Sequence, residues 1–144
     1  MTVKHILKQF DLPAAVRWIV LTVWMAVFLT YLLQSEGSPV LSTGITPGPP
    51  TPAREAFFTA IHLIAYAVTT LLWAWALITI MPLKRTLIVT FGLVLSMSFL
   101  TELAQTLTPD RHFQLIDLAA NLGGLLLGLV GFGILYRWYA EQSI

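Results

Sequence analysis

Residues 98–128 read SFLTELAQTLTPDRHFQLIDLAANLGGLLLG and decide the fold of this chain. Apolar residues dominate on both sides of Thr108-Pro109-Asp110-Arg111, a proline-containing stretch typical of a tight turn. Two membrane-spanning helices joined by that turn are predicted, yet Glu102, Arg111 and Asp117 lie inside or beside them. A charged side chain costs about 2.5 to 3.5 kcal/mol at the centre of a membrane helix. The fold must therefore provide partners that offset the cost of burying these charges.

The composition predicts an integral membrane protein. Hydrophobic residues make up 57% of the 144 residues, charged residues make up 10%, and the mean hydropathy is +0.80. Soluble domains carry about 25% charged residues, and a soluble fold this apolar would aggregate. The net charge is +1 without a basic cluster, which argues against nucleic-acid binding. The absence of cysteine excludes disulfides, thiolate catalysis and cysteine-ligated metals.

Four apolar segments are each about 20 to 25 residues long, enough to cross a hydrocarbon core of about 30 Å. Backbone polar groups in lipid must be paired within the segment, so each segment is predicted to be a helix. The first is longer than the core of a signal peptide and is interpreted as an uncleaved span. The chain is thus predicted to be an all-α membrane protein, a four-helix bundle, with spans at Ala14–Leu33, Phe57–Met81, Leu87–Leu107 and Phe113–Tyr136.

Three regions follow from these spans: the first helix in residues 1–33, a connection in 34–56, and a three-helix region in 57–144. The connection contains GITPGPPTP, which cannot form a regular helix because proline lacks the amide donor. We expect an extended loop with polyproline II character. Such loops are usually surface spacers, and a specific partner-binding role stays open as the alternative.

Basic residues set the expected orientation. Six lie before or in the first turn of the first helix, join the second to the third or follow the fourth: Lys4, Lys8, Arg17, Lys84, Arg85 and Arg137. The other side has only Arg54 and Arg111. The positive-inside rule then predicts a multi-pass protein of the cytoplasmic membrane with both termini in the cytoplasm. The proline-rich loop and the Asp110-Arg111 turn are expected outside.

Each of the last three spans carries a pair of polar residues three or four positions apart, so the members of a pair share a helix face. We predict that they form one polar cluster near the outer surface, made of His62, Tyr66, Glu102, Gln105, Arg111, Asp117 and Asn121. Arg111 is expected to compensate Glu102 and Asp117, while the other members satisfy the remaining lone pairs. Polar packing between helices would explain any single member, but seven at one depth favour a functional site.

Other chemistries have weaker support in the sequence. No metal and no cofactor is predicted: His62, Glu102 and Asp117 could ligate a cation, but a single histidine is a weak signal and Arg111 would repel a metal. A triad of Ser98, His62 and Asp117 is conceivable, although Ser98 could instead bond its own backbone. No nucleophile is identified, so enzymatic activity stays open.

Small residues recur along the fourth span. Ala120, Gly124 and Gly128 are four positions apart, with Gly131 nearby. Such a stripe lets a second membrane helix approach closely. We expect it to pack the fourth helix against a neighbour and thereby to set the geometry of the polar cluster.

At these residues the chain resembles the VanZ-like family. The resemblance covers Phe57 to Tyr136 and consists of His62-x-x-x-Tyr66, Glu102-x-x-Gln105, and the spacing of Arg111, Asp117, Asn121 and Gly124. The family is named for a bacterial member associated with resistance to teicoplanin, a lipid-tailed glycopeptide, and the resemblance implies no established reaction. The charged residue usual shortly before the histidine is replaced by Phe57 and Phe58.

Two classes of function remain open. In the first, the outward polar cluster binds or processes a lipid-linked or lipid-tailed molecule. In the second, the chain is a small accessory subunit of a larger membrane complex, and the cluster only holds the bundle together. The expected partners are membrane lipids together with either a lipid-linked small molecule or other membrane subunits, and no nucleic acid.

Overall fold

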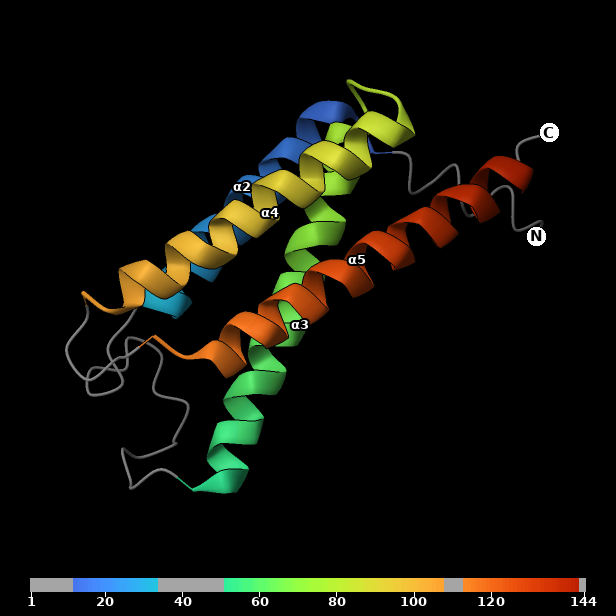
Figure 1. The fold of residues 1–144 in the computed structure, drawn as a ribbon. Helices are drawn as coiled ribbons and strands as arrows, with labels where there is room; N and C mark the ends of the chain where they lie inside the picture. Colours follow the sequence, from blue (N-terminus) through green and yellow to red (C-terminus); the bar gives the residue numbers. More distant parts are fainter. Residues whose placement is uncertain (1–11, 34–50, 108–112, 143–144) are drawn as a thin grey trace.

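The computed structural model describes residues 12–33, 51–107 and 113–142, and this part of the chain is almost entirely helical (Figure 1). The helices are α2 (Ala14–Leu33), α3 (Pro52–Leu77), α4 (Leu83–Gln105) and α5 (Leu115–Gln142). All four are long and apolar enough to cross a membrane. The predicted fold class, an all-α bundle of four membrane helices, is confirmed.

One helix boundary differs in an informative way from the prediction. α3 begins at Pro52 and not at Phe57, so the last part of the proline-rich connection is helical. Proline is tolerated in the first turn of a helix because its missing N–H would have no intrahelical partner there. The first turn is closed by the Glu55 N–H, which donates to the Thr51 carbonyl at 3.0 Å. Residues 34–50 of the predicted loop lie outside the described residues.

The connection between α3 and α4 is short. α3 ends at Leu77 instead of Met81, and the chain turns once before Pro82, which stands at the N-cap of α4 in an extended conformation. Because proline disfavours helical geometry in the residue before it, it separates the two helices. The predicted tight turn at 108–111 lies outside the described residues. α5 continues beyond Tyr136 to Gln142.

The helices alternate in direction, which gives the bundle two distinct ends. α3 crosses α5 in the closest of the helix contacts, and α2 lies beside α4 (Figure 1). Near one end, the Gln105 side chain of α4 bonds the Leu32 carbonyl of α2. Near the other, the Arg17 side chain of α2 bonds the Trp75 carbonyl of α3. We call the first the cluster end and the second the aromatic end.

Two glycines of the predicted stripe bring α5 against α3. A Cβ atom at Gly124 would overlap the Leu63 carbonyl oxygen and lie 2.9 Å from the Ala67 nitrogen. At Gly128 it would lie 2.6 Å from the Thr70 Cβ and 2.8 Å from the Ala67 oxygen. Since real side-chain carbons do not come this close, only glycine permits the observed separation. The contact fixes how far α5 slides and turns relative to α3.

The buried face of α4 is polar except at one residue, Val94. Its buried residues are Thr86, Thr90, Val94, Ser98, Thr101, Glu102 and Gln105. Its outer face is apolar and exposed, with Ile88, Phe91, Phe99, Leu100 and Leu103. This inversion is stable in a membrane because lipid tails solvate apolar side chains as well as a protein core does. The polar side chains of α4 therefore face the interior of the bundle.

Candidate functional site

Polar side chains from α3, α4 and α5 meet at the cluster end. Six of the seven predicted members lie in the described residues, and all six are buried. Their exposed fractions are 0% for Tyr66, Glu102 and Asn121, 2% for Gln105, 3% for His62 and 7% for Asp117. The seventh, Arg111, lies outside the described residues, so its pairing with the carboxylates stays a prediction.

Asn121 of α5 bridges the other two helices. Its Nδ2 donates to Glu102 Oε1 at 3.3 Å, and its Oδ1 lies 3.0 Å from His62 Nδ1. An ionised carboxylate and an amide oxygen can only accept, so the bridge requires His62 to carry a proton on Nδ1. A neutral His62 then has its lone pair on Nε2. One amide thus orients both the imidazole and the carboxylate.

Asp117 adds a second carboxylate to this bridge. It lies in the first turn of α5, one turn before Asn121, where the helix dipole favours negative charge. One ligand atom each from His62, Glu102 and Asp117 lie within 4.8 Å of one another. His62 Nδ1 is 4.0 Å from Glu102 Oε1. We refer to these three residues, one from each helix, as the three-ligand group.

The second oxygen of Glu102 is the most unusual atom of the site. Glu102 Oε2 is buried and has no hydrogen-bond partner among the described residues. The backbone of Gln114, just before α5, also interacts with this carboxylate. A buried polar atom left without a partner costs about 1 to 3 kcal/mol, and more when it is charged. Hydrogen-bonding capacity therefore remains at the centre of the cluster.

Tyr66 and Gln105 lie in the cluster, and each makes a hydrogen bond to a group other than the carboxylates. The Tyr66 hydroxyl lies 2.6 Å from Thr101 Oγ1, and Gln105 Nε2 donates to the Leu32 carbonyl at 3.2 Å. Carbonyls in the last turn of a helix lack an intrahelical partner, so Gln105 satisfies the end of α2. Both residues tie helices together around the site.

Thr101 is a member of the site that the sequence did not single out. Its hydroxyl lies 2.9 Å from the Met97 carbonyl and 3.2 Å from the Ser98 carbonyl, so it donates into its own helix. The Tyr66 hydroxyl must then be the donor to Thr101. The signal for Thr101 was its position four residues before Gln105, on the same face of α4.

Ser98 takes neither of the roles considered for it. Its Oγ is buried and, in the part of the chain that the structure describes, bonds neither His62 nor its own backbone. A serine that no base contacts is a poor nucleophile. The arrangement therefore supports binding or proton transfer and does not support a serine triad.

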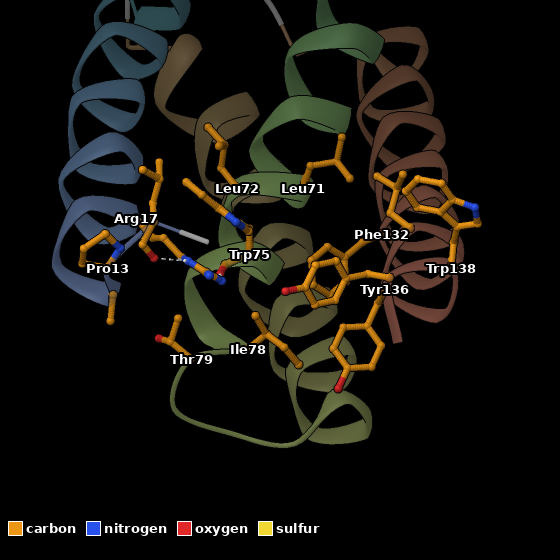
Figure 2. Close-up of a pocket in the computed structure, with 14 residues that line it drawn as sticks. Pro13, Arg17, Leu71, Leu72, Trp75, Ile78, Thr79, Phe132, Tyr136 and Trp138 are labelled. Carbon is orange, nitrogen blue, oxygen red and sulfur yellow. Dashed lines mark hydrogen bonds between the residues drawn. The ribbon is translucent and has the colours of Figure 1, made fainter. Parts of the chain in front are cut away.

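The aromatic end holds a groove of about 830 Å³ between α2, α3 and α5 (Figure 2). Its walls include Trp75, Phe132 and Tyr136, and Arg17 lies at its edge. The Arg17 guanidinium stands 5.1 Å from the centre of the Trp75 ring and donates to the carbonyls of Leu12 and Trp75. The lining contains no carboxylate and no imidazole, so the chemistry of this end is that of a membrane interface.

No protein-family model matches the chain, and the comparisons with curated proteins and with solved structures found no match. The capacity of the site follows from its own side chains. They are two carboxylates and one oriented imidazole, held at the end of a bundle whose outer surface is apolar. Such a group can hold a cation, bind a polar head group or move a proton.

Proposed function

We propose that this chain is a VanZ-like protein of a bacterial cytoplasmic membrane, whose polar cluster binds the polar part of a lipid-linked or lipid-tailed molecule. One observation carries the proposal. Two carboxylates and an imidazole from three helices are enclosed together, and one carboxylate oxygen has no partner among the described residues. An ionisable residue inside a membrane is by default a functional-site candidate, because it is expensive to keep there.

Helix packing alone does not call for this composition. Polar contacts between membrane helices contribute about 0.6 to 2 kcal/mol each, and threonine or asparagine provides them without a charge. The bundle already has such contacts in Tyr66 with Thr101 and in Gln105 with Leu32. Glu102 and Asp117 are therefore better explained by a ligand than by the fold.

The outward orientation of the cluster is supported by the distribution of basic residues. Arg17, Lys84, Arg85 and Arg137 belong to helix ends that lie at the aromatic end, opposite the cluster. Under the positive-inside rule the aromatic end is cytoplasmic and both termini lie in the cytoplasm. The cluster then meets molecules in the outer leaflet.

Each member of the site has a role in this proposal. Glu102 and Asp117 attract cationic groups or hydrogen-bond donors, and the Nε2 lone pair of His62 accepts a proton or a ligand. Arg111, which precedes α5 in the sequence, meets anionic groups of the bound molecule. The resistance role associated with the family would be one case of such binding, since teicoplanin carries a lipid tail.

Purification in mild detergent from the native membrane tests the proposal. Mass spectrometry of co-purified lipids and proteins should find a specific lipid-linked molecule with the wild type and with Glu55→Gln. Glu55 is an exposed acid at the same end of the bundle, so its variant is a matched control. Glu102→Gln and Asp117→Asn should lose the molecule. Unchanged lipid content in all four proteins would defeat the proposal.

One observation favours an accessory subunit as the second candidate. Gly92 and Ser96 are exposed and four positions apart on the outer face of α4, and a Cβ at Gly92 would meet nothing within 4 Å. This small-residue pair would let a partner helix approach closely. In the same purification, a stoichiometric membrane protein that is lost in Gly92→Leu, and retained in Glu102→Gln, would establish this function.

A further inference from the structure

We infer that the three-ligand group, His62, Glu102 and Asp117, binds one divalent first-row metal ion, for which zinc is the best match. The inference rests on the proposed function in taking this cluster as a ligand site, and it names a small ligand for it. The sequence alone argued against a metal. The structure adds the convergence, the enclosure and the hydrogen-bond pattern of the three side chains.

The distances suit a metal after small side-chain adjustments. The three ligand atoms lie within 4.8 Å of one another. Zinc bonds of about 2.0 to 2.2 Å place tetrahedral ligands roughly 3.3 to 3.6 Å apart. The last torsion of an aspartate or glutamate side chain is broad and permits the carboxylate to turn.

The hydrogen bonds already present are those of a metal site. Asn121 accepts the Nδ1 proton of His62, which leaves the lone pair of a neutral imidazole on Nε2. Ligating histidines in metalloproteins commonly donate their other ring N–H in this way, which fixes the tautomer and the ring orientation. Asn121 also donates to Glu102 Oε1, while Oε2 is left without a hydrogen-bond partner in residues 12–33, 51–107 and 113–142.

The charges of the group select a divalent cation. Two ionised carboxylates and a neutral imidazole carry two negative charges, so one divalent ion makes the site neutral. Neutrality matters here because the surrounding bundle and lipid have a low dielectric constant. A guanidinium from Arg111 could balance the charge of the carboxylates, but it would not require the imidazole. A metal ion would be ligated by all three side chains.

The ligand types select among metals. Calcium and magnesium prefer sites built from oxygen alone, and an imidazole nitrogen disfavours them. Zinc accepts nitrogen and oxygen together, and three protein ligands leave its fourth position open for water or a bound group. Enclosure also restricts size, since no member of the three-ligand group is more than 7% exposed. A single ion suits this enclosure.

Zinc titration of the full-length protein in detergent tests the inference. After treatment with a chelator, zinc is added in competition with a chromophoric chelator, and bound metal is counted by mass spectrometry. We expect one zinc per chain in the wild type and in Glu55→Gln. Binding should weaken at least about 100-fold in His62→Ala, Glu102→Gln and Asp117→Asn, and about 10- to 100-fold in Asn121→Ala. Calcium should not compete.

Two outcomes would overturn the inference. One is a wild type that binds no more zinc than a triple variant that combines His62→Ala, Glu102→Gln and Asp117→Asn. The other is zinc bound with equal affinity by the wild type and by folded single variants. If the variants do not fold, X-ray absorption of the zinc-loaded wild type decides. A shell of one imidazole nitrogen with oxygen neighbours supports the assignment, and any other shell contradicts it.

The inference and the proposed function can fail separately. Zinc bound by the three-ligand group of a protein that carries no lipid-linked molecule would support the metal site and defeat the proposed function. The reverse result has two parts: zinc-loaded and metal-free protein retain a lipid-linked molecule equally, and Glu102→Gln and Asp117→Asn bind zinc as the wild type does. That result would support the proposed function and defeat the metal site.

Discussion

The two ends of the bundle are built from the same four helices, but one end is lined by polar side chains and the other by aromatic ones. At the cluster end, buried polar side chains surround two carboxylates and an imidazole. At the aromatic end, rings such as Trp75 and Phe132 surround a groove of about 830 Å³. Aromatic rings at a membrane interface anchor a helix without a desolvation penalty. A buried carboxylate carries such a penalty, so the polar end is where selection for something other than stability is to be sought.

The two ends also treat their charged groups differently. Arg17 donates to two backbone carbonyls and stands over the Trp75 ring, so its surroundings satisfy it. Glu102 is fully buried, and only its Oε1 accepts a hydrogen bond from a described side chain, that of Asn121. A satisfied charge belongs to the fold, whereas a charge with remaining capacity indicates a ligand. Four predictions test this contrast.

The largest effect on stability is expected at Gly124, where α5 packs against α3. Gly124→Leu forces a side chain into the Leu63 carbonyl, and overpacking against backbone should destabilise the bundle by about 3 kcal/mol or more. Thermal unfolding in detergent measures the change. Gly133→Leu is the control, because a Cβ at Gly133 meets nothing within 4 Å. Equal stability of the two variants would contradict the close approach of α3 and α5.

Removing the bridge should have the next largest effect. Asn121→Ala takes away the partner of His62 Nδ1 and of Glu102 Oε1 at once, and leaving buried polar groups unpaired costs about 1 to 3 kcal/mol. Chemical or thermal unfolding of the metal-free protein measures this loss. A double-mutant cycle with His62→Ala should show coupling. Strict additivity of the two changes would argue against the bridge.

Neutralising Glu102 should change stability with the opposite sign. In metal-free protein, Glu102→Gln removes a buried charge and keeps an oxygen to accept from Asn121, so stability should rise by roughly 1 to 2 kcal/mol. Zinc should then stabilise the wild type and leave the variant unchanged. Glu55→Gln, at an exposed site, should behave as the wild type does. A metal-free Glu102→Gln protein that melts below the wild type would indicate a structural role for the charge.

The smallest effect is expected at the aromatic end. Arg17→Lys loses the planar guanidinium over the Trp75 ring, a contact worth about 0.5 to 1 kcal/mol, and leaves the positive charge in place. Stability in detergent should fall slightly, while zinc content and co-purified lipids stay unchanged. Loss of zinc in this variant would show that the two ends are coupled and would break the contrast between them.

The sequence by itself determined the fold class and the members of the site. Four stretches are hydrophobic and long enough to span a membrane. Because backbone groups in lipid must be paired, these stretches are predicted to be helices. Helical periodicity assigned His62, Glu102, Asp117 and Asn121 to one depth, and each of them is buried. Depth and face along a single helix can be read from spacing because the period of the helix is known.

Only the tertiary structure decided which polar groups pair. Tyr66 binds Thr101, and Gln105 binds the Leu32 carbonyl; both partners depend on how neighbouring helices are rotated about their axes. That rotation is set by the contact of Gly124 with α3, which no single-helix pattern encodes. The aromatic groove was also beyond reach, since its lining comes from three helices separated by long stretches of chain. Spacing determines what each helix presents, and packing determines what each side chain meets.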